Sequence, residues 1–427
     1  RGMNDKDRER EFSRIKNMGL NIARTWYRPD WACGSSLYNE FNLKSEKMEA
    51  FCSWLDKMKE LNVDVAIQAG WWITKDTYYG NEQPDTVKDP ARYAEWIRES
   101  LNYLINIKGY TNIKYLVLFT EPLNYNSGIV PAGTTQQDYY EKICRSIHNE
   151  LVKAGLRDRL KFVGPNSGST RNAQWVGWAM EKMNDIIDIY SWHAYNATRF
   201  DREYGGWKDI TEIGKDKITK TGKPFWIDEY GAGYPDETVR FQPDYGNYLA
   251  QCISAFTNSG AQTSLIWLLM NQLYPSPLEH ADGNDSFYNG VHRWGLTRWP
   301  HDSQPDSTKP YPAWYAFSMM SRYLPGRNGV KVLQTTNDDS LYITSVKLPG
   351  KGISILVVNA SHKTQKFEVK FDSKQELTLC RHLYDPANVV VTEDAEMIKK
   401  DKDYSLIGDI FADELPARGV AVYTTIE

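Results

Sequence analysis

Two glutamates in this sequence follow short apolar runs of the kind that form buried strands. Glu121 ends the run VLFTEP, and Glu229 ends FWIDEY, where the apolar residues stop at two adjacent acids. One carboxylate at a strand end is usually a helix cap or an ion-pair partner. Two carboxylates that face one cleft can do more, because one can protonate a leaving oxygen while the other attacks or stabilises a cationic carbon.

The elements that must bring these acids together are read from the hydrophobic pattern. Up to about residue 325, amphipathic helices alternate with short apolar runs, which is typical of repeated βα units. Ser45 is expected to cap one of these helices, and Asp89 with Pro90 opens another. Seven strand candidates result: LNIARTW, VDVAIQAGWW, IKYLVLFTEP, LKFVGPNSG, IIDIYSWHAYN, PFWIDEYG and AQTSLIWLLMNQ.

This series predicts an α/β protein with a (β/α)8 TIM barrel over residues 1–327. Only the first strand is missing, so it lies upstream of Arg1 or is replaced by another segment. The competing fold, a doubly wound sheet, would need a Gly-rich phosphate loop, and no GxGxxG or GxxxxGK[ST] occurs. In a barrel the carboxyl ends of all strands meet at one face, so Glu121 and Glu229 are expected to converge.

From about residue 330 the pattern changes to short alternating or apolar runs between turns. These are LYITSVKL, GISILVVNA, KFEVKF, LTLCRHLY and GVAVYTT, and they predict an antiparallel β-sandwich over residues 328–427. Residues 273–310 are rich in Gly, Pro, Asp and aromatics and are too long for a simple connector, which favours a functional loop.

Composition excludes several classes of function. The net charge of −4 over 427 residues offers no basic face for nucleic acid. The five cysteines are scattered without CxxC spacing, and no histidines stand at metal-ligand spacing, so we expect neither a metal nor a disulfide framework. The aromatic content of 13%, with 15 Trp and 27 Tyr, exceeds what a core needs and makes stacking surfaces plausible.

The cellular location of the protein is predicted from its first residues and its apolar runs. No run reaches membrane-spanning length, and the chain opens on Arg1 and Gly2 in place of a signal peptide. We therefore expect a processed form of a longer precursor, located outside the cell, in the periplasm or at the cell surface.

In their order along the chain, the motifs ARTW, TEP, WHAYN and WIDEYG resemble those of clan A retaining glycoside hydrolases. Their barrels carry the acid/base on strand four and the nucleophile on strand seven, as in the cellulase/mannanase-like and glucosylceramidase-like families. Many members also carry a C-terminal β-sandwich, so the resemblance covers most of the chain. It implies cleavage of an oligo- or polysaccharide without a cofactor, with Glu121 as general acid/base and Glu229 as nucleophile.

The resemblance also implies supporting residues. Arg24 matches an arginine that keeps the nucleophile ionised. His193 and Tyr195 match a His-x-Tyr in which the tyrosine hydroxyl touches the nucleophile, although His193 alone would be read as a structural histidine. Trp267 falls near a tryptophan that forms the floor of the sugar site.

One position departs from the family. Relatives read Asn-Glu-Pro where this chain has Thr120, and the asparagine binds the sugar 2-hydroxyl. Hydrogen bonds to that hydroxyl strengthen in the transition state and supply several kcal/mol. Asn166 and Asn196, at other predicted strand ends, are candidates to replace the lost amide.

Further aromatic side chains are candidates for stacking on sugar rings. Trp71 and Trp72 end one predicted strand, where one of the two is expected to pack against helices. Trp294 and Trp299 in the long loop serve equally well as sugar platforms or as loop anchors. The acidic DGND at 282–285 lacks the rest of an EF-hand loop and is read as a solvated turn, and Ser167 lacks the GxSxG context of a nucleophile.

Two other functions use the same residues. A catalytically silent carbohydrate-binding barrel would keep the aromatic cleft without proficient chemistry, and Thr120 is the feature that favours it. A transglycosylase would pass the sugar to an acceptor other than water. The carboxyl separation distinguishes the mechanisms, because about 5 to 5.5 Å fits retention and roughly 6.5 to 9.5 Å fits inversion.

Overall fold

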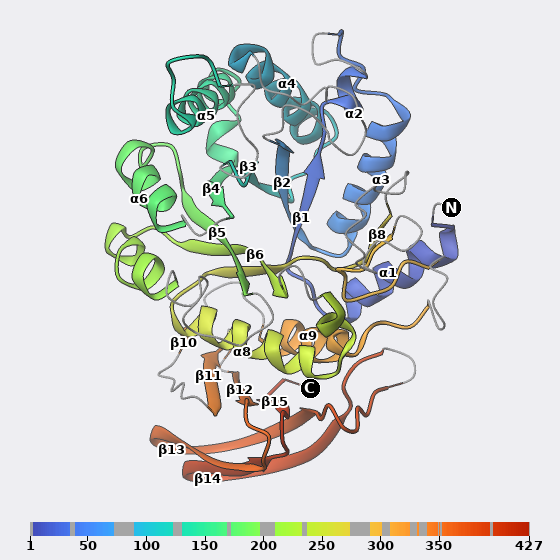
Figure 1. Ribbon diagram of the computed structural model, residues 1–427. Coiled ribbons are helices and arrows are strands. Elements are labelled where there is room, and N and C mark those ends of the chain that lie inside the picture. Colours follow the sequence, from blue (N-terminus) through green and yellow to red (C-terminus); the bar gives the residue numbers. More distant parts are fainter. Residues whose placement is uncertain are drawn as a thin grey trace. The chain divides into compact units, whose positions relative to one another are not determined.

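The computed structural model, shown in Figure 1, describes most of the chain. The described residues are 3–34, 39–71, 89–122, 130–168, 172–196, 210–232, 237–273, 291–300, 308–324, 331–332, 340–348, 350, 352–392 and 396–426. Contacts divide the chain into two compact units. One holds Asn21–Ala194 and Gly205–Glu229, and the other holds Arg1–Leu20, Tyr195–Tyr204 and Tyr230–Glu427.

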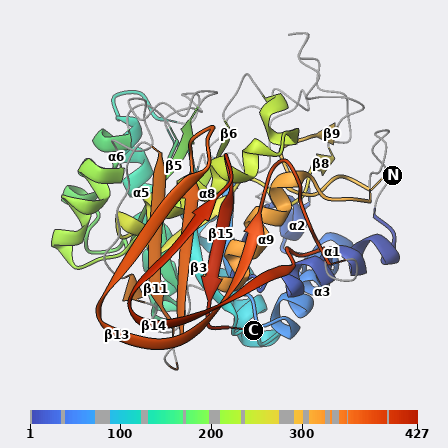
Figure 2. The same ribbon diagram turned by 90° about the horizontal axis from the view of Figure 1, so that it is seen from below.

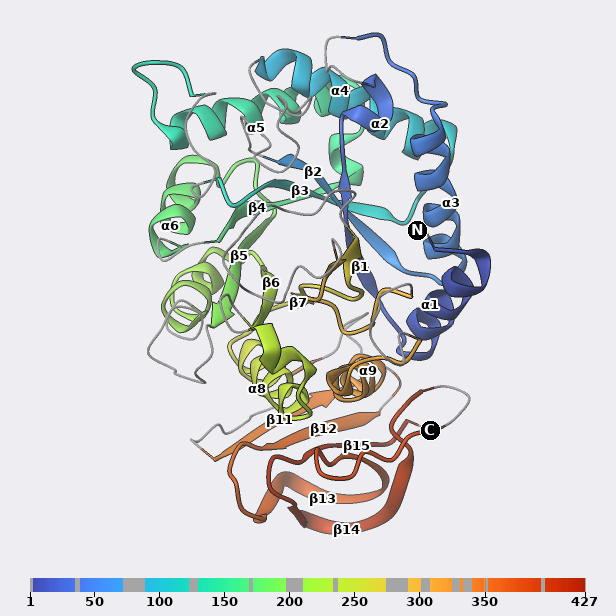
Figure 3. The same cartoon turned by 45° about the vertical axis from the view of Figure 1, so that its right-hand side comes forward.

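A seven-stranded parallel sheet of the barrel type confirms the predicted βα series. Its strand order is β1-β2-β3-β4-β5-β6-β7, which is the order along the chain. The strands are β1 (Ile22–Tyr27), β2 (Asp64–Trp71), β3 (Ile113–Thr120), β4 (Lys161–Ser167), β5 (Ile189–Asn196), β6 (Phe225–Ala232) and β7 (Thr263–Ile266). In Figure 3 the helices α3 (Glu46–Glu60), α4 (Pro90–Asn102), α5 (Gln136–Lys153) and α6 (Asn172–Lys182) lie outside the curve of β1 to β5.

Side-chain caps fix where these helices begin, as predicted for two of them. The hydroxyl of Ser45 accepts a hydrogen bond from the backbone N–H of Met48 at the start of α3. Asp89 accepts from two backbone N–H groups at the start of α4, whose first residue is Pro90. Both caps satisfy amide groups that have no partner within the helix.

The segment that precedes β6 forms two short turns in place of a regular α-helix. A π turn spans Ile210–Lys215, and a 3₁₀ turn spans Ile218–Thr221. The backbone at Gly214 approaches the ring of Phe225 so closely that an added Cβ would lie 2.6 Å from it. Contact with β6, rather than helix propensity, therefore decides the local structure.

The strands that carry the two glutamates are almost fully buried. Every residue of β6 is buried, and β3 is buried from Leu116 to Thr120. Strands covered on both faces are typical of parallel sheets flanked by helices. Across the barrel interior the rings of Tyr115 and Trp226 meet edge to face, with centroids 4.7 Å apart. The carboxyl ends of β3 and β6 are thus set on a rigid support.

The C-terminal part forms a second, antiparallel sheet, which confirms the predicted β-domain. Its order is β10-β11-β12-β15-β13-β14, and Figure 2 shows the long, curved strands β13 and β14. The bounds are β10 (Lys331–Val332), β11 (Leu341–Lys347), β12 (Ile353–Asn359), β13 (Gln365–Tyr384), β14 (Lys400–Leu415) and β15 (Val420–Thr424). An apolar cluster that includes Ile355, Phe367, Leu379, Phe411 and Tyr423 fills its inner face.

Two features of this sheet differ from the sequence expectation. KFEVKF and LTLCRHLY belong to one strand of 20 residues, β13, whose pairing with β14 shifts register between Lys370 and Gln375. Strand β14 was not predicted, because its sequence KDKDYSLIGDIFADEL is too polar to signal a strand. It pairs with β13 along its length, and its buried side chains Leu406, Phe411 and Leu415 join the core.

Helices α8 (Asp244–Asn258) and α9 (Pro312–Tyr323) pack on the antiparallel sheet, and helix α1 (Asp5–Asn17) is tied to its loops. Arg14 of α1 is buried and bonds the carboxylates of Glu11 and Glu396, each at 2.5 Å, and the carbonyl of Thr308 at 2.6 Å. Glu396 stands at a left-handed φ of +49°, and its carbonyl accepts a hydrogen bond from the indole of Trp314. Residues near both ends of the sequence thus share one buried ion-pair network.

None of the described helices is long and apolar enough to cross a membrane. The boundary at residue 327 between a barrel domain and a sandwich domain stays a prediction.

Candidate active site

Glu121 lies directly after β3 in an unusual backbone conformation. Its φ is +44°, in the left-handed region that residues with a side chain rarely adopt. Its N–H donates to the carbonyl of Asn166 at 2.9 Å, so the end of β4 holds the turn in place. This turn directs a partly exposed carboxylate away from the buried course of β3.

Glu229 lies within β6 and is 6% exposed. The guanidinium of Arg24, on β1, forms an ion pair with its Oε1. Both side chains are largely withdrawn from water, where a fixed opposite charge stabilises the carboxylate far more than it would at the surface. Arg24 and Glu229, which the sequence placed on separate strand ends, are therefore direct partners.

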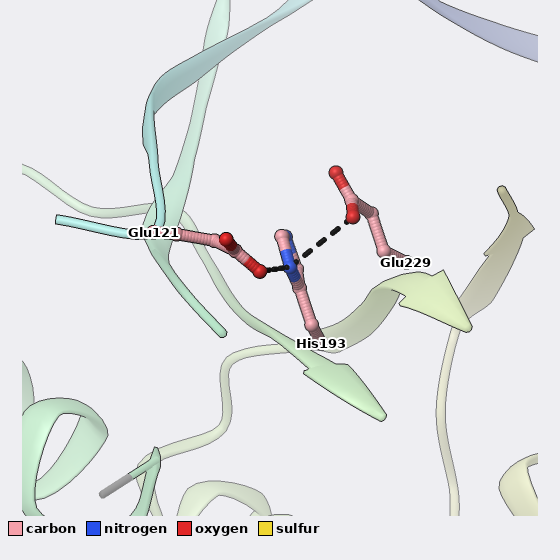
Figure 4. Close-up of side chains that lie close together, drawn as sticks. All are labelled: Glu121, His193 and Glu229. Carbon is pink, nitrogen blue, oxygen red and sulfur yellow. Dashed lines mark hydrogen bonds and ion pairs between the residues drawn. The ribbon is translucent and has the colours of Figure 1, made fainter. Parts of the chain in front are cut away.

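His193 stands between the two glutamates (Figure 4). Its Nδ1 lies 2.8 Å from Oε1 of Glu121 and 3.2 Å from Oε2 of Glu229. Its Nε2 lies 3.9 Å from Oδ1 of Asp228. Burial disfavours the imidazolium, but the carboxylates of Glu229, Glu121 and Asp228 outweigh it and raise the pKa of His193 above the ordinary 6.5.

The two carboxylates are close neighbours. One oxygen of Glu121, one of Glu229 and a ring nitrogen of His193 all lie within 4.8 Å of one another. Among the described residues this is the group with three ligand atoms that could surround a metal ion. Arg24 already supplies a fixed positive charge there, which opposes the entry of a cation.

Asp228 and Asn166 form a second layer beneath the glutamates. Both are fully buried, and the amide of Asn166 donates to Oδ2 of Asp228. Oδ1 of Asn166 has no hydrogen-bond partner within the described part of the chain. The sequence singled out Asn166 as a sugar-binding candidate, whereas in the structure its amide is engaged by Asp228. The only sequence signal for this contact was the pair of adjacent acids at the end of β6.

The other predicted residues are placed as follows. Thr120 is the last residue of β3 and is 4% exposed. Tyr195 and Asn196 end β5, and the side chain of Asn196 is not described. Trp72 and the DGND segment lie outside the described residues.

Trp267 and Trp294 lie in the other compact unit, both half-buried. The N–H of Trp267 donates to the carbonyl of Tyr230 at 3.0 Å, and a cis peptide bond joins Trp267 to Leu268. The carbonyl of Trp294 accepts from the N–H of Leu268 at 3.1 Å, and the guanidinium of Arg240 lies 5.8 Å from the centre of the indole ring. Both tryptophans are thus anchored next to the end of β7.

No family model and no curated protein sequence matches the chain. Solved structures match it over nearly its whole length. A family 30 subfamily 8 glycoside hydrolase, the xylanase Xyn30A from Clostridium acetobutylicum, has 15% identity and a TM-score of 0.64, covering 97% of this chain and 92% of its own. The endo-beta1,6-glucanase BT3312 has 13% identity and a TM-score of 0.62, covering 99% and 87%.

A family 39 glycoside hydrolase from the gut symbiont Bacteroides cellulosilyticus WH2 is similar as well. It has 14% identity and a TM-score of 0.62, covering 98% of this chain and 78% of its own. These likenesses confirm the predicted barrel with its C-terminal β-domain, and the neighbours fit the resemblance to clan A enzymes. At such low identities they show the fold alone.

Proposed function

We propose that this protein is a retaining glycoside hydrolase that cleaves O-glycosidic bonds of an oligo- or polysaccharide. The observation that carries the proposal is the close approach of two strand-end carboxylates, because one oxygen of Glu121 lies within 4.8 Å of one oxygen of Glu229. Retaining enzymes hold their carboxyl groups about 5 to 5.5 Å apart, whereas inverting enzymes leave about 6.5 to 9.5 Å for a water molecule. The short separation supports double displacement.

In the first step Glu229 attacks the anomeric carbon while Glu121 protonates the leaving oxygen. A glycosyl ester forms on Glu229, and the C–O bond to the leaving group breaks. In the second step Glu121 takes a proton from water, and the resulting hydroxide displaces Glu229 from the sugar. The Arg24 ion pair supports Glu229 in this role, because it favours the ionised nucleophile.

His193 can supply the proton that this cycle requires. Glu121 needs a proton for the first step, and Nδ1 of His193 lies 2.8 Å from its Oε1. A protonated His193 can therefore pass a proton to Glu121 over one hydrogen bond. Activity is therefore expected to fall as the pH rises through the raised pKa of His193.

The substrate class follows from the site only in general terms. Similar structures are described as a xylanase and an endo-beta1,6-glucanase, so xylan and β-1,6-glucan are the first polymers to test. An extracellular, periplasmic or cell-surface location suits a polysaccharide substrate, and one similar structure is described as a conserved exported protein from Bacteroides fragilis.

The decisive experiment replaces each glutamate separately. Glu229→Ala is expected to lower kcat on the cleaved polymer by about 10⁴-fold or more, as removal of a nucleophile does elsewhere. Glu121→Gln is expected to spare only substrates with good leaving groups, because these need no protonation. Product configuration is followed by proton NMR, and retention at the anomeric carbon is expected. Near-normal rates in either variant on an intact glycan would refute the proposal.

Thr120 favours a second candidate, a carbohydrate-binding barrel without proficient chemistry. It replaces the family asparagine and is almost fully buried. Calorimetry that shows glycan binding by the wild type, with no product formed, would select this alternative. Longer oligosaccharide products in place of shorter ones would instead indicate transglycosylation by the same two glutamates.

A further inference from the structure

The carboxyl end of β4 touches both strands that carry the proposed catalytic pair. The backbone carbonyl of Asn166 accepts the N–H of Glu121 at 2.9 Å. The side-chain amide of the same residue donates to Asp228, which directly precedes Glu229. One residue thus bonds the backbone of one glutamate and the chain neighbour of the other.

Asn166 and Glu121 both adopt left-handed backbone conformations, with φ of +56° and +44°. Such conformations persist in residues with side chains only where the surroundings over-determine them. Here the bond between the two backbones and the buried bond to Asp228 supply that constraint. The side chain of Asn166 is withdrawn from water, and its amide nitrogen donates to Asp228.

Gly168 provides the space in which the Glu121 carboxylate lies. A Cβ at this position would stand 2.0 Å from Oε1 of Glu121 and 2.5 Å from its carboxyl carbon. No such contact is possible between real atoms, so any side chain at residue 168 would displace the carboxylate. Glycine is required here because the Glu121 carboxylate lies so close to its backbone, and not because of a positive φ.

The same segment also supports the histidine between the glutamates. The hydroxyl of Ser167 donates to Oδ1 of Asn172 at 2.9 Å, and the amide of Asn172 donates to the carbonyl of His193 at 3.0 Å. All three residues are buried. The end of β4 therefore has bonded connections to β3, β5 and β6.

We propose that Asn166 and Gly168 are positioning residues that hold the Glu121 carboxylate against His193 and Glu229. Asn166 fixes the backbone turn through its carbonyl and ties that turn to β6 through Asp228, while Gly168 leaves room for the carboxylate. The role of these residues in catalysis rests on the proposed function. Their contacts with Glu121 and Asp228 do not depend on it.

Exchange of the Asn166–Asp228 pair tests the first half of the proposal. In Asn166→Asp two buried carboxylates face each other, so they repel or share a proton. We expect kcat to fall about 100-fold at neutral pH with little change in KM, as for a small misplacement of a catalytic group. Because one shared proton relieves the repulsion, part of the loss should be recovered at lower pH. The reversed pair Asn166→Asp/Asp228→Asn restores one donor and one acceptor and should return to within about tenfold of wild type.

The kinetic probes are the 2,4-dinitrophenyl and phenyl β-glycosides of xylobiose and gentiobiose. A misplaced acid should cost more on the phenyl substrates, which need protonation, than on the dinitrophenyl substrates. Equal losses on both, activity of Asn166→Asp within threefold of wild type, or a reversed pair no better than the single variant would each overturn the role of Asn166.

Gly168→Ala tests the second half with little risk to folding, because the clash is with the flexible end of one side chain. Gly177→Ala in α6 is the matched control, since an added Cβ there meets nothing within 4 Å. We expect about a 100-fold loss of kcat on the phenyl substrates for Gly168→Ala and none for the control. A fully active Gly168→Ala variant would overturn the proposal.

A measurement without any sugar separates this inference from the proposed function. NMR titration of labelled histidines, assigned with His193→Gln, reports the charges that face His193, namely Glu121, Glu229 and Asp228. If Glu121 moves away, the titration midpoint of His193 should fall in Gly168→Ala, which adds no charge, but not in Gly177→Ala. An unchanged midpoint in Gly168→Ala would overturn the inference. A wild type that cleaves no glycan while the midpoint shifts would refute the function alone.

Discussion

Two polar clusters of this molecule, one partly buried and one largely buried, are built from similar residues but differ in how the charge of their acids is offset. In the C-terminal sheet, Oδ2 of Asp413 accepts hydrogen bonds from Arg381 at 2.8 Å, Tyr423 at 2.7 Å and Tyr404. Asp413 thus meets two hydroxyl groups and one cation, and that cation also pairs with Asp401 at 2.6 Å. At the carboxyl ends of the barrel strands, three acids share Arg24 and His193.

The difference lies in how completely each acid is balanced. Burial opposes the ionisation of Asp413, but hydrogen bonds from Tyr404 and Tyr423 outweigh it and lower its pKa. In the barrel, Oδ1 of Asp228 accepts no hydrogen bond from the described residues. The nearby residues Glu121 and Asn166 adopt strained, left-handed backbone conformations. A cluster in which every carboxylate is satisfied stabilises the structure around it. A cluster with excess negative charge costs stability, so the surrounding structure has to hold it in place. We therefore propose that the first cluster serves the fold and the second the proposed chemistry.

Loss of Asp413 should therefore cost stability and leave activity intact. Asp413→Ala removes the shared acceptor of Arg381, Tyr404 and Tyr423, and we expect the free energy of unfolding to fall by about 3 kcal/mol. Urea denaturation measures this change. Asp401→Ala, which breaks a more exposed pair with Arg381, is the control and should cost less than about 1 kcal/mol. A drop in activity without a drop in stability would reverse the assignment of the two clusters.

The two clusters should also lose their stabilising effect at opposite ends of the pH scale. The pKa of His193 is raised on folding, so its contribution is complete below 6.5 and is lost as the pH rises through the folded pKa. The pKa of Asp413 is lowered, so its contribution is complete above 3.8 and is lost as the pH falls through the folded pKa. Each group changes the free energy of unfolding by at most about 1.4 kcal/mol per pH unit.

Thermal unfolding from pH 3 to pH 10 measures these slopes. His193→Gln should flatten the alkaline limb and Asp413→Asn the acid limb. If His193→Gln alters the acid limb instead, folding does not raise the pKa of His193.

The smallest expected effect is a gain in stability. Glu121→Gln removes one of the three acids, keeps a hydrogen-bond acceptor for His193 and should raise the free energy of unfolding by about 1 kcal/mol while activity is lost. Differential scanning calorimetry of the variant and the wild type measures this gain. A loss of stability would mean that the acids at the strand ends are balanced after all.

The sequence predicted the convergence of Arg24, Glu121, His193 and Glu229, because each stands at or near the carboxyl end of a parallel strand and the fold brings those ends together. It did not predict the bond between Asn166 and Asp228 or the room made by Gly168. Those depend on a left-handed turn and on distances of a few ångströms, which no periodicity encodes. Strand β14 was missed for a different reason, since its polar, charged sequence becomes a strand only by pairing with β13.

The ion pair between Arg14 and Glu396 joins residues 382 positions apart. During synthesis on the ribosome, α1 emerges well before Glu396, so its buried arginine has to wait for 382 further residues before this partner exists. Native contacts this distant in sequence slow folding and leave early segments exposed to misassociation. We therefore expect chains truncated before residue 396 to keep Arg14 paired with Glu11 alone, so that Glu396 completes the charge balance of this arginine only late in synthesis.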